Sequence, residues 1–61
     1  MNIKDLEIKD SFNLGSETEI VLANVISKNN TTYLGCFICY NDKCQLIGFD
    51  KDYYILRKKF K

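Results

Sequence analysis

Apolar residues in this chain form short segments that are separated by polar turn residues. Three of these segments are rich in β-branched and aromatic residues, which favour strands: 19–28 (EIVLANVISK), 31–40 (TTYLGCFICY) and 44–50 (CQLIGFD). Asn29-Asn30 and Asn41-Asp42 lie between the segments, and these residue types tolerate the positive φ of tight hairpin turns. The pattern predicts an antiparallel three-stranded meander.

The two ends of the chain add the remaining predicted elements. The apolar residues Leu6, Ile8, Phe12 and Leu14 fall on even positions, which suits a strand that Asp10 interrupts. Ile3 and Leu6 alone would suit one helical turn, so residues 3–12 are open between helix and strand. Residues 53–60 (YYILRKKF) favour a last strand. About five strands with tight connections in residues 1–61 predict a single all-β domain, a small antiparallel barrel of the SH3-like or OB-like type.

One N-terminal motif resembles a known class of domain. Residues 5–12, DLEIKDSF, are similar to the entry "DL-x-hydrophobic-x-D-x-F" of many small SH3-like domains, which occur as stand-alone binding modules in bacteria and their phages. The resemblance implies a small β-barrel and transfers no functional residue to this chain.

The spacing of the three cysteines makes them candidates for a metal site. Cys36 and Cys39 form a C-x-x-C pair that Cys44 follows, whereas a structural zinc site needs four converging ligands and this chain has no histidine. A two-residue turn at Asn41-Asp42 would place Cys39 opposite Cys44 and turn Cys36 to the other face. We therefore expect no metal. Cys39 and Cys44 are close enough in this register for a disulfide, but a reducing cytosol favours two buried thiols.

The predicted register gives the meander two apolar faces. With Asn29-Asn30 as a two-residue turn, the face expected to be the core carries Val21, Ala23, Val25, Leu34, Cys36, Ile38, Ile47 and Phe49. The opposite face is also apolar, although antiparallel sheets normally turn a polar face to water. We expect this second face to be an interface with a second subunit or a partner protein. Its candidate residues are Ile20, Leu22, Ile26, Tyr33, Phe37, Cys39, Cys44 and Leu46.

Charge adds a second candidate surface. The formal net charge of +1 gives the chain no overall attraction to nucleic acid or membrane, but basic residues gather near the C-terminus. Aromatic rings beside cations can stack on bases and bind phosphates. The candidate anion or ligand contacts are Tyr53, Tyr54, Arg57, Lys58 and Lys59.

Catalysis is not expected, because the chain has no histidine, no glycine-rich phosphate loop and no nucleophile–base pair at local spacing. No cofactor is expected either. The charged N-terminal segment, MNIKDLEIKD, lacks the apolar core of a signal peptide, and no apolar run is long enough to span a membrane. We therefore expect a cytoplasmic protein.

The expected function is that of a small non-enzymatic binding or inhibitor protein. A composition rich in Lys, Asn, Ile, Asp and Tyr is typical of an AT-rich genome, such as that of a low-GC bacterium or its phage. A phage protein of this kind would act in the host cytoplasm on a defence or regulatory protein, through the second apolar face. Two alternatives stay open: a homo-oligomer that sequesters a nucleotide signal, and a small barrel that binds single-stranded nucleic acid.

Overall fold

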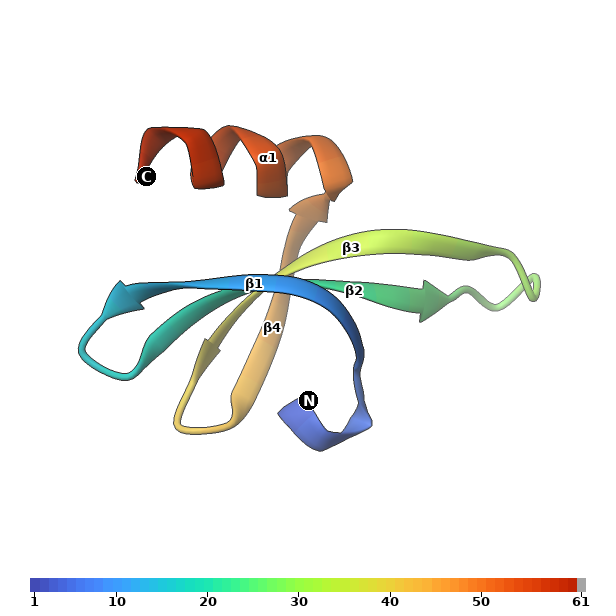
Figure 1. Cartoon of the computed structure of the whole chain (residues 1–61). Coiled ribbons are helices and arrows are strands. Elements are labelled where there is room, and N and C mark those ends of the chain that lie inside the picture. Colours follow the sequence, from blue (N-terminus) through green and yellow to red (C-terminus); the bar gives the residue numbers. More distant parts are fainter. Residues whose placement is uncertain (61) are drawn as a thin grey trace.

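The computed structural model describes residues 1–60 and shows an antiparallel sheet with the strand order β1-β2-β3-β4 (Figure 1). The elements in chain order are the 3₁₀-helix η1 (Ile3–Asp5), β1 (Glu7–Gly15), β2 (Thr18–Ile26), β3 (Thr32–Tyr40), β4 (Lys43–Phe49) and the helix α1 (Asp50–Lys59). The predicted small β-rich fold and its central meander are confirmed. A five-stranded barrel is not confirmed, because the four strands form an open sheet in the described part of the chain.

The predicted last strand at 53–60 is wrong, because residues 50–59 form α1. Asp50 and Asp52 lie in its first turn and three basic residues lie in its last turn, so the charges match the helix macrodipole at both ends. Asp52 Oδ2 also accepts a hydrogen bond from the backbone N–H of Phe49 at 2.9 Å. This bond satisfies the backbone donor just before the first turn of the helix.

Gly48 makes the passage from β4 into α1 possible. A Cβ atom at this position would lie 2.3 Å from Asp52 Oδ2 and 2.9 Å from the Asp52 Cβ atom. The missing side chain therefore leaves the space that the capping carboxylate occupies.

The turn between β3 and β4 has the predicted form. Asn41 and Asp42 have φ angles of 49° and 68°, as a tight two-residue hairpin requires. Tyr40 pairs with Lys43 across the turn, and Cys39 pairs with Cys44 next to it.

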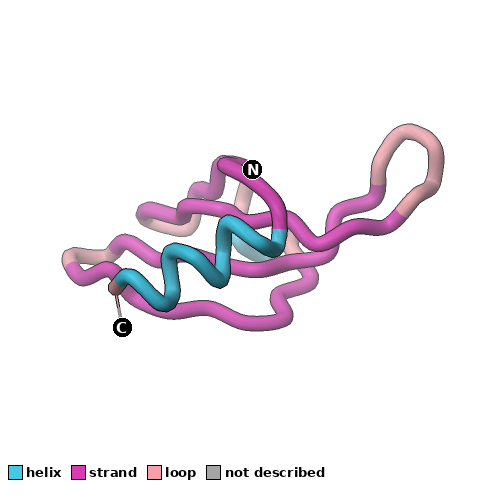
Figure 2. The backbone as a smooth tube through the Cα atoms, turned by 90° about the horizontal axis from the view of Figure 1, so that it is seen from above, coloured by secondary structure: helices cyan, strands magenta, loops and turns pink. Residues whose placement is uncertain are grey.

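The turn between β2 and β3 is one residue longer than predicted. The backbone N–H of Ser27 donates to the Thr31 carbonyl at 2.8 Å, which leaves the three residues 28–30 as the loop. Asn30 has a φ of 60°, the left-handed conformation that closes three-residue hairpin loops. Figure 2 shows this loop projecting beyond the rest of the sheet. The longer loop shifts the β2–β3 register by one residue.

The observed register creates two apolar faces, and a different segment covers each one (Figure 1). We call the face under α1 the helix face; its core consists of Ile20, Leu22, Cys36 and Tyr53, with Phe12, Leu34, Ile38 and Leu56 packed around them. The other, the N-terminal face, has the core Val21, Ala23, Phe37, Cys39 and Cys44, with Ile3, Leu6 and Val25 packed against it. The predicted core face was wrong, because a one-residue shift moves every β3 side chain to the opposite face relative to β2.

The N-terminal segment contains both elements that the sequence left open. η1 is the single helical turn, and β1 follows it with a register irregularity between Ile8 and Asp10. Before η1 the chain runs beside β4: the N–H of Ile3 donates to the Asp42 carbonyl at 2.8 Å, and the N–H of Cys44 donates to the Met1 carbonyl. The segment thus connects the outer edge of β4 to β1.

The three cysteines lie on two faces of the sheet, as the predicted hairpin requires. Cys39 and Cys44 form a disulfide, whereas the sequence favoured two reduced thiols. Cys36 is a buried free thiol on the helix face, and its burial raises the pKa of the thiol above the ordinary value. Residues 1–60 contain no group of three or more His, Cys, Asp or Glu side chains arranged to hold a metal ion.

Candidate functional site

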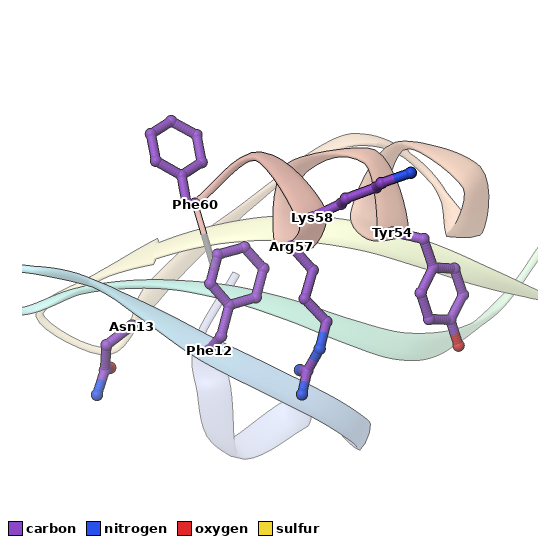
Figure 3. A pocket seen from close by; sticks show the side chains of 6 residues that line it. All are labelled: Phe12, Asn13, Tyr54, Arg57, Lys58 and Phe60. Carbon is purple, nitrogen blue, oxygen red and sulfur yellow. The ribbon is translucent and has the colours of Figure 1, made fainter.

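A groove of about 540 Å³ lies between β1 and α1 (Figure 3). Its lining consists of Phe12, Asn13, Tyr54, Arg57, Lys58 and Phe60. Three aromatic rings, two cations and one amide are therefore gathered in one hollow. Figure 3 shows the Arg57 side chain between the rings of Phe12 and Tyr54, while the side chain of Asn13 points away from α1.

Tyr53 forms the floor beneath this groove. Its side chain is fully buried, and its ring centroid lies 5.6 Å from that of Phe12 and 5.3 Å from that of Tyr54. Both pairs have an edge-to-face geometry, which aromatic rings prefer. Burial raises the pKa of the Tyr53 phenol, so it is neutral near pH 7. The three rings form one packed cluster that joins β1 to α1, and of these rings Phe12 and Tyr54 line the groove.

Arg57 connects this floor to β1. Its Nη1 atom donates to the Tyr53 hydroxyl at 3.0 Å and to Asp10 Oδ2 at 3.1 Å. The hydrogen bond with Tyr53 and the charge of Asp10 raise the pKa of Arg57 above its ordinary value. About half of the Arg57 side chain stays exposed, so part of the guanidinium can still meet a ligand. The two hydrogen bonds therefore position Arg57, and the Asp10 carboxylate also partly neutralises its charge.

The C-terminal end of α1 carries the other cations. Lys58 lines the groove, and the Lys59 ammonium lies 6.0 Å from the centre of the Phe60 ring, within the range of a cation–π contact. These lysines also lie where positive charge stabilises a helix end. Lys58 thus serves the stability of the helix and adds charge to the groove, while Lys59 lies beside the groove at Phe60.

The predicted ligand contacts are partly brought together in this groove. Tyr54, Arg57 and Lys58 line it, Tyr53 is buried below it, and Lys59 lies beside its Phe60 wall. The sequence did not identify Phe12, Asn13 and Phe60 as lining residues. A helical interpretation of 50–60 would have found part of the lining, because Tyr54, Arg57 and Lys58 share one helix face at spacings of three and four residues.

The eight residues predicted as one interface do not share a face. Strand alternation places Ile20, Leu22 and Ile26 on the helix face, and Tyr33, Phe37, Cys39, Cys44 and Leu46 on the N-terminal face. Five of the eight are buried by the chain itself: Ile20, Leu22, Phe37, Cys39 and Cys44. The prediction of a shared face is wrong for the same reason as the predicted core face: the β2–β3 register is shifted by one residue. A binding role for the exposed Ile26 and Leu46 stays a prediction.

Comparisons with protein-family models, curated proteins and solved structures give no match to this chain. The residues of the groove are therefore the basis for assigning a function. Within residues 1–60, no helix is both long and apolar enough to cross a membrane.

Proposed function

We propose that the protein is a small non-enzymatic binding protein, and that its groove between β1 and α1 binds an anion that carries a planar ring, such as a nucleotide. The observation that carries the proposal is the presence of two exposed rings, Tyr54 and Phe60, in one groove with the cations Arg57 and Lys58. Rings stack on bases and cations bind phosphate oxygens, so the two chemical parts of a nucleotide have partners here.

The dimensions and construction of the groove support a small ligand. Its volume of about 540 Å³ falls in the range of small-molecule sites. Tyr53 is buried beneath it and Arg57 is held by two hydrogen bonds, so two of the central side chains are fixed before binding. A fixed site loses less conformational entropy when a ligand binds.

The overall charge favours a small ligand over a long polynucleotide. A net charge of +1 is low for a domain that binds many phosphates. The proposal is therefore closest to the sequence-based alternative of a protein that sequesters a nucleotide signal.

Titration with purine and pyrimidine nucleotides, followed by backbone amide NMR shifts, tests this proposal. We expect the largest shifts at residues of the groove, and we expect Tyr54→Ala and Lys58→Ala each to weaken binding by about tenfold, because each removes a stacking surface or a phosphate contact. Tyr40→Ala and Lys43→Ala are the matched controls, since Tyr40 is as exposed as Tyr54 (54%) and both residues lie outside the groove. Absence of binding at millimolar nucleotide, or shifts remote from the groove, would contradict the proposal.

Self-association through β4 is a second candidate function. Leu46 and Phe49 are 43% and 54% exposed on the N-terminal face, where the Phe49 ring lies 5.5 Å from that of Tyr33. β4 is an edge strand, and in the described chain the bridge to its outer edge is made at Lys43, near its start. Residues 44–49 contain no charge and no proline, which are two of the usual protections of a free edge; a third, a bulge, is present at Ile47, opposite Cys36 and Phe37. A second copy can therefore pair along this edge and cover the apolar side chains.

Light scattering after size exclusion, at chain concentrations from micromolar to millimolar, tests this candidate. We expect a mass approaching that of two chains at the highest concentration, and a return to one chain in Leu46→Lys, because the new charge would be buried between the copies. Ile55→Lys is the control, since Ile55 is an exposed apolar residue of α1. A single-chain mass at every concentration would exclude self-association.

A further inference from the structure

Asp10 is the acidic group that faces the candidate site. It follows the register irregularity of β1, and its Oδ1 atom accepts a hydrogen bond from the Ser11 backbone N–H at 3.0 Å. Its other oxygen, Oδ2, lies 3.1 Å from Arg57 Nη1. One carboxylate is therefore oriented by its own strand and held against a cation of the groove.

This contact changes the charge that the groove offers to a ligand. The Asp10–Arg57 pair has no net charge near pH 7, whereas Lys58 makes no ion pair within residues 1–60. Of the two lining cations, Lys58 is therefore the one without a compensating carboxylate in the described part of the chain. Arg57 can still donate hydrogen bonds from its exposed part, but its attraction for distant charge is largely cancelled by Asp10.

We propose that Asp10 makes the groove selective for a singly charged phosphodiester attached to a base, and against phosphate groups of higher charge. The inference rests on the proposed function, because it concerns which nucleotide the same groove accepts. Cyclic mononucleotides and the internal links of an oligonucleotide share this chemistry, whereas a terminal phosphate monoester carries a charge of about −1.5 to −2 near pH 7.

The physical reason is the balance between attraction and desolvation. The attraction of an anion to Lys58 grows in proportion to the ligand charge. The cost of removing the anion from water grows with the square of that charge, as for any ion that leaves a high dielectric. Repulsion by Asp10 also grows with ligand charge. Because Lys58 is the lining cation that has no carboxylate partner within residues 1–60, a single negative charge gives the best balance.

Calorimetric titration at one pH and one salt concentration tests the charge preference. The ligands are 3′,5′-cyclic AMP and the dinucleotide ApA, which carry one charge, against AMP and ATP, which carry more. We expect the singly charged ligands to bind at least about threefold more tightly than AMP or ATP, a difference of the size that exposed charges produce. A wild-type protein that prefers ATP would overturn this inference and leave the proposed function intact. A protein that binds none of the four would overturn both.

Asp10→Asn gives the sharper measurement. Asparagine keeps an oxygen for the Ser11 N–H and frees the charge of Arg57, so we expect ATP affinity to rise about tenfold and cyclic AMP affinity to rise only about twofold. Asp42→Asn is the control: it changes the net charge equally at an exposed turn outside the groove, where asparagine tolerates the positive φ. An equal rise for both ligands in Asp10→Asn, or the same change in Asp42→Asn, would overturn the role of Asp10.

Salt dependence distinguishes the two sources of a phosphodiester. A single-stranded oligonucleotide that binds through several links should show a slope of about −0.7 per phosphate in log affinity against log salt. A slope near −0.7 for a long oligonucleotide identifies a one-phosphate site and supports a small ligand. A steeper slope for the oligonucleotide, with singly charged ligands still preferred over AMP and ATP, identifies the internal links of a single-stranded nucleic acid as the source of the phosphodiester. If neither ApA nor the oligonucleotide binds more tightly than AMP and ATP, the inference is overturned.

Discussion

Tyr53→Ala should lower the free energy of unfolding by about 3–5 kcal/mol, the usual cost of removing a large buried aromatic side chain. Tyr53 is the largest fully buried side chain and joins α1 to the sheet through its contacts on the helix face. Domains of this length have a total stability of roughly 3–9 kcal/mol. We therefore expect Tyr53→Ala to lose about a third or more of the total stability, which urea denaturation followed by circular dichroism would measure.

Tyr53→Phe is the control for this prediction. It keeps the ring in contact with Phe12 and removes only the hydroxyl that accepts a hydrogen bond from Arg57. The expected loss is about 0.5–1.5 kcal/mol. Equal losses in the two variants would show that the hydrogen bond, and not ring burial, attaches the helix. An unchanged midpoint in Tyr53→Ala would contradict the observed packing of α1.

Breaking the disulfide between Cys39 and Cys44 should have the second largest effect. The bond closes a short loop, with a sequence separation of 5, and chain entropy gives such a link a stabilisation of about 2 kcal/mol. For a domain of this size that corresponds to a fall in Tm of about 8–16 °C. Thermal unfolding of the Cys39→Ser, Cys44→Ser double variant, and of the wild type with a phosphine reductant, would measure it.

A thiol count provides the control for the disulfide. The denatured oxidised chain should contain one reactive thiol, that of Cys36, and the reduced chain should contain three. Cys36→Ala keeps the disulfide, so reductant should lower the Tm of this variant by no more than it lowers the Tm of the wild type. Three thiols before reduction, or an unchanged Tm after it, would contradict the prediction.

The two hairpins of the meander show how far the sequence could predict register. Asn41-Asp42 forms the expected turn, so the pairing of Cys39 with Cys44 was predicted correctly. The Asn29-Asn30 segment supports two loop lengths, and residue type alone does not distinguish them. The Ser27 backbone and side chain decide it, since Thr31 N–H donates to the Ser27 Oγ atom at 3.2 Å. Because the predicted loop was one residue too short, the predicted register placed the apolar side chains of β2 and β3 on the wrong faces.

The C-terminal segment shows a competition between local preferences. Tyr53, Tyr54 and Ile55 have strand-forming side chains, which favoured a strand. The helix is supported by charges at both ends and by burial of Tyr53 with Leu56, three positions apart, on the sheet. The cations of the candidate site could therefore be identified from the sequence, but their arrangement could not. Phe12 joins them through the contact of its ring with Tyr53 of α1, a contact between distant parts of the chain.

The N-terminal segment has a consequence for the order of folding. Each hairpin of the sheet joins neighbours in sequence, whereas the contacts of Met1 and Ile3 with Cys44 and Asp42 close a loop that contains most of the chain. Such closure costs more entropy than a hairpin does, so docking of this segment should follow hairpin formation. Cys39 and Cys44 would then meet within a local hairpin while still open to an oxidant. The segment that afterwards covers them would make their bond slow to reduce.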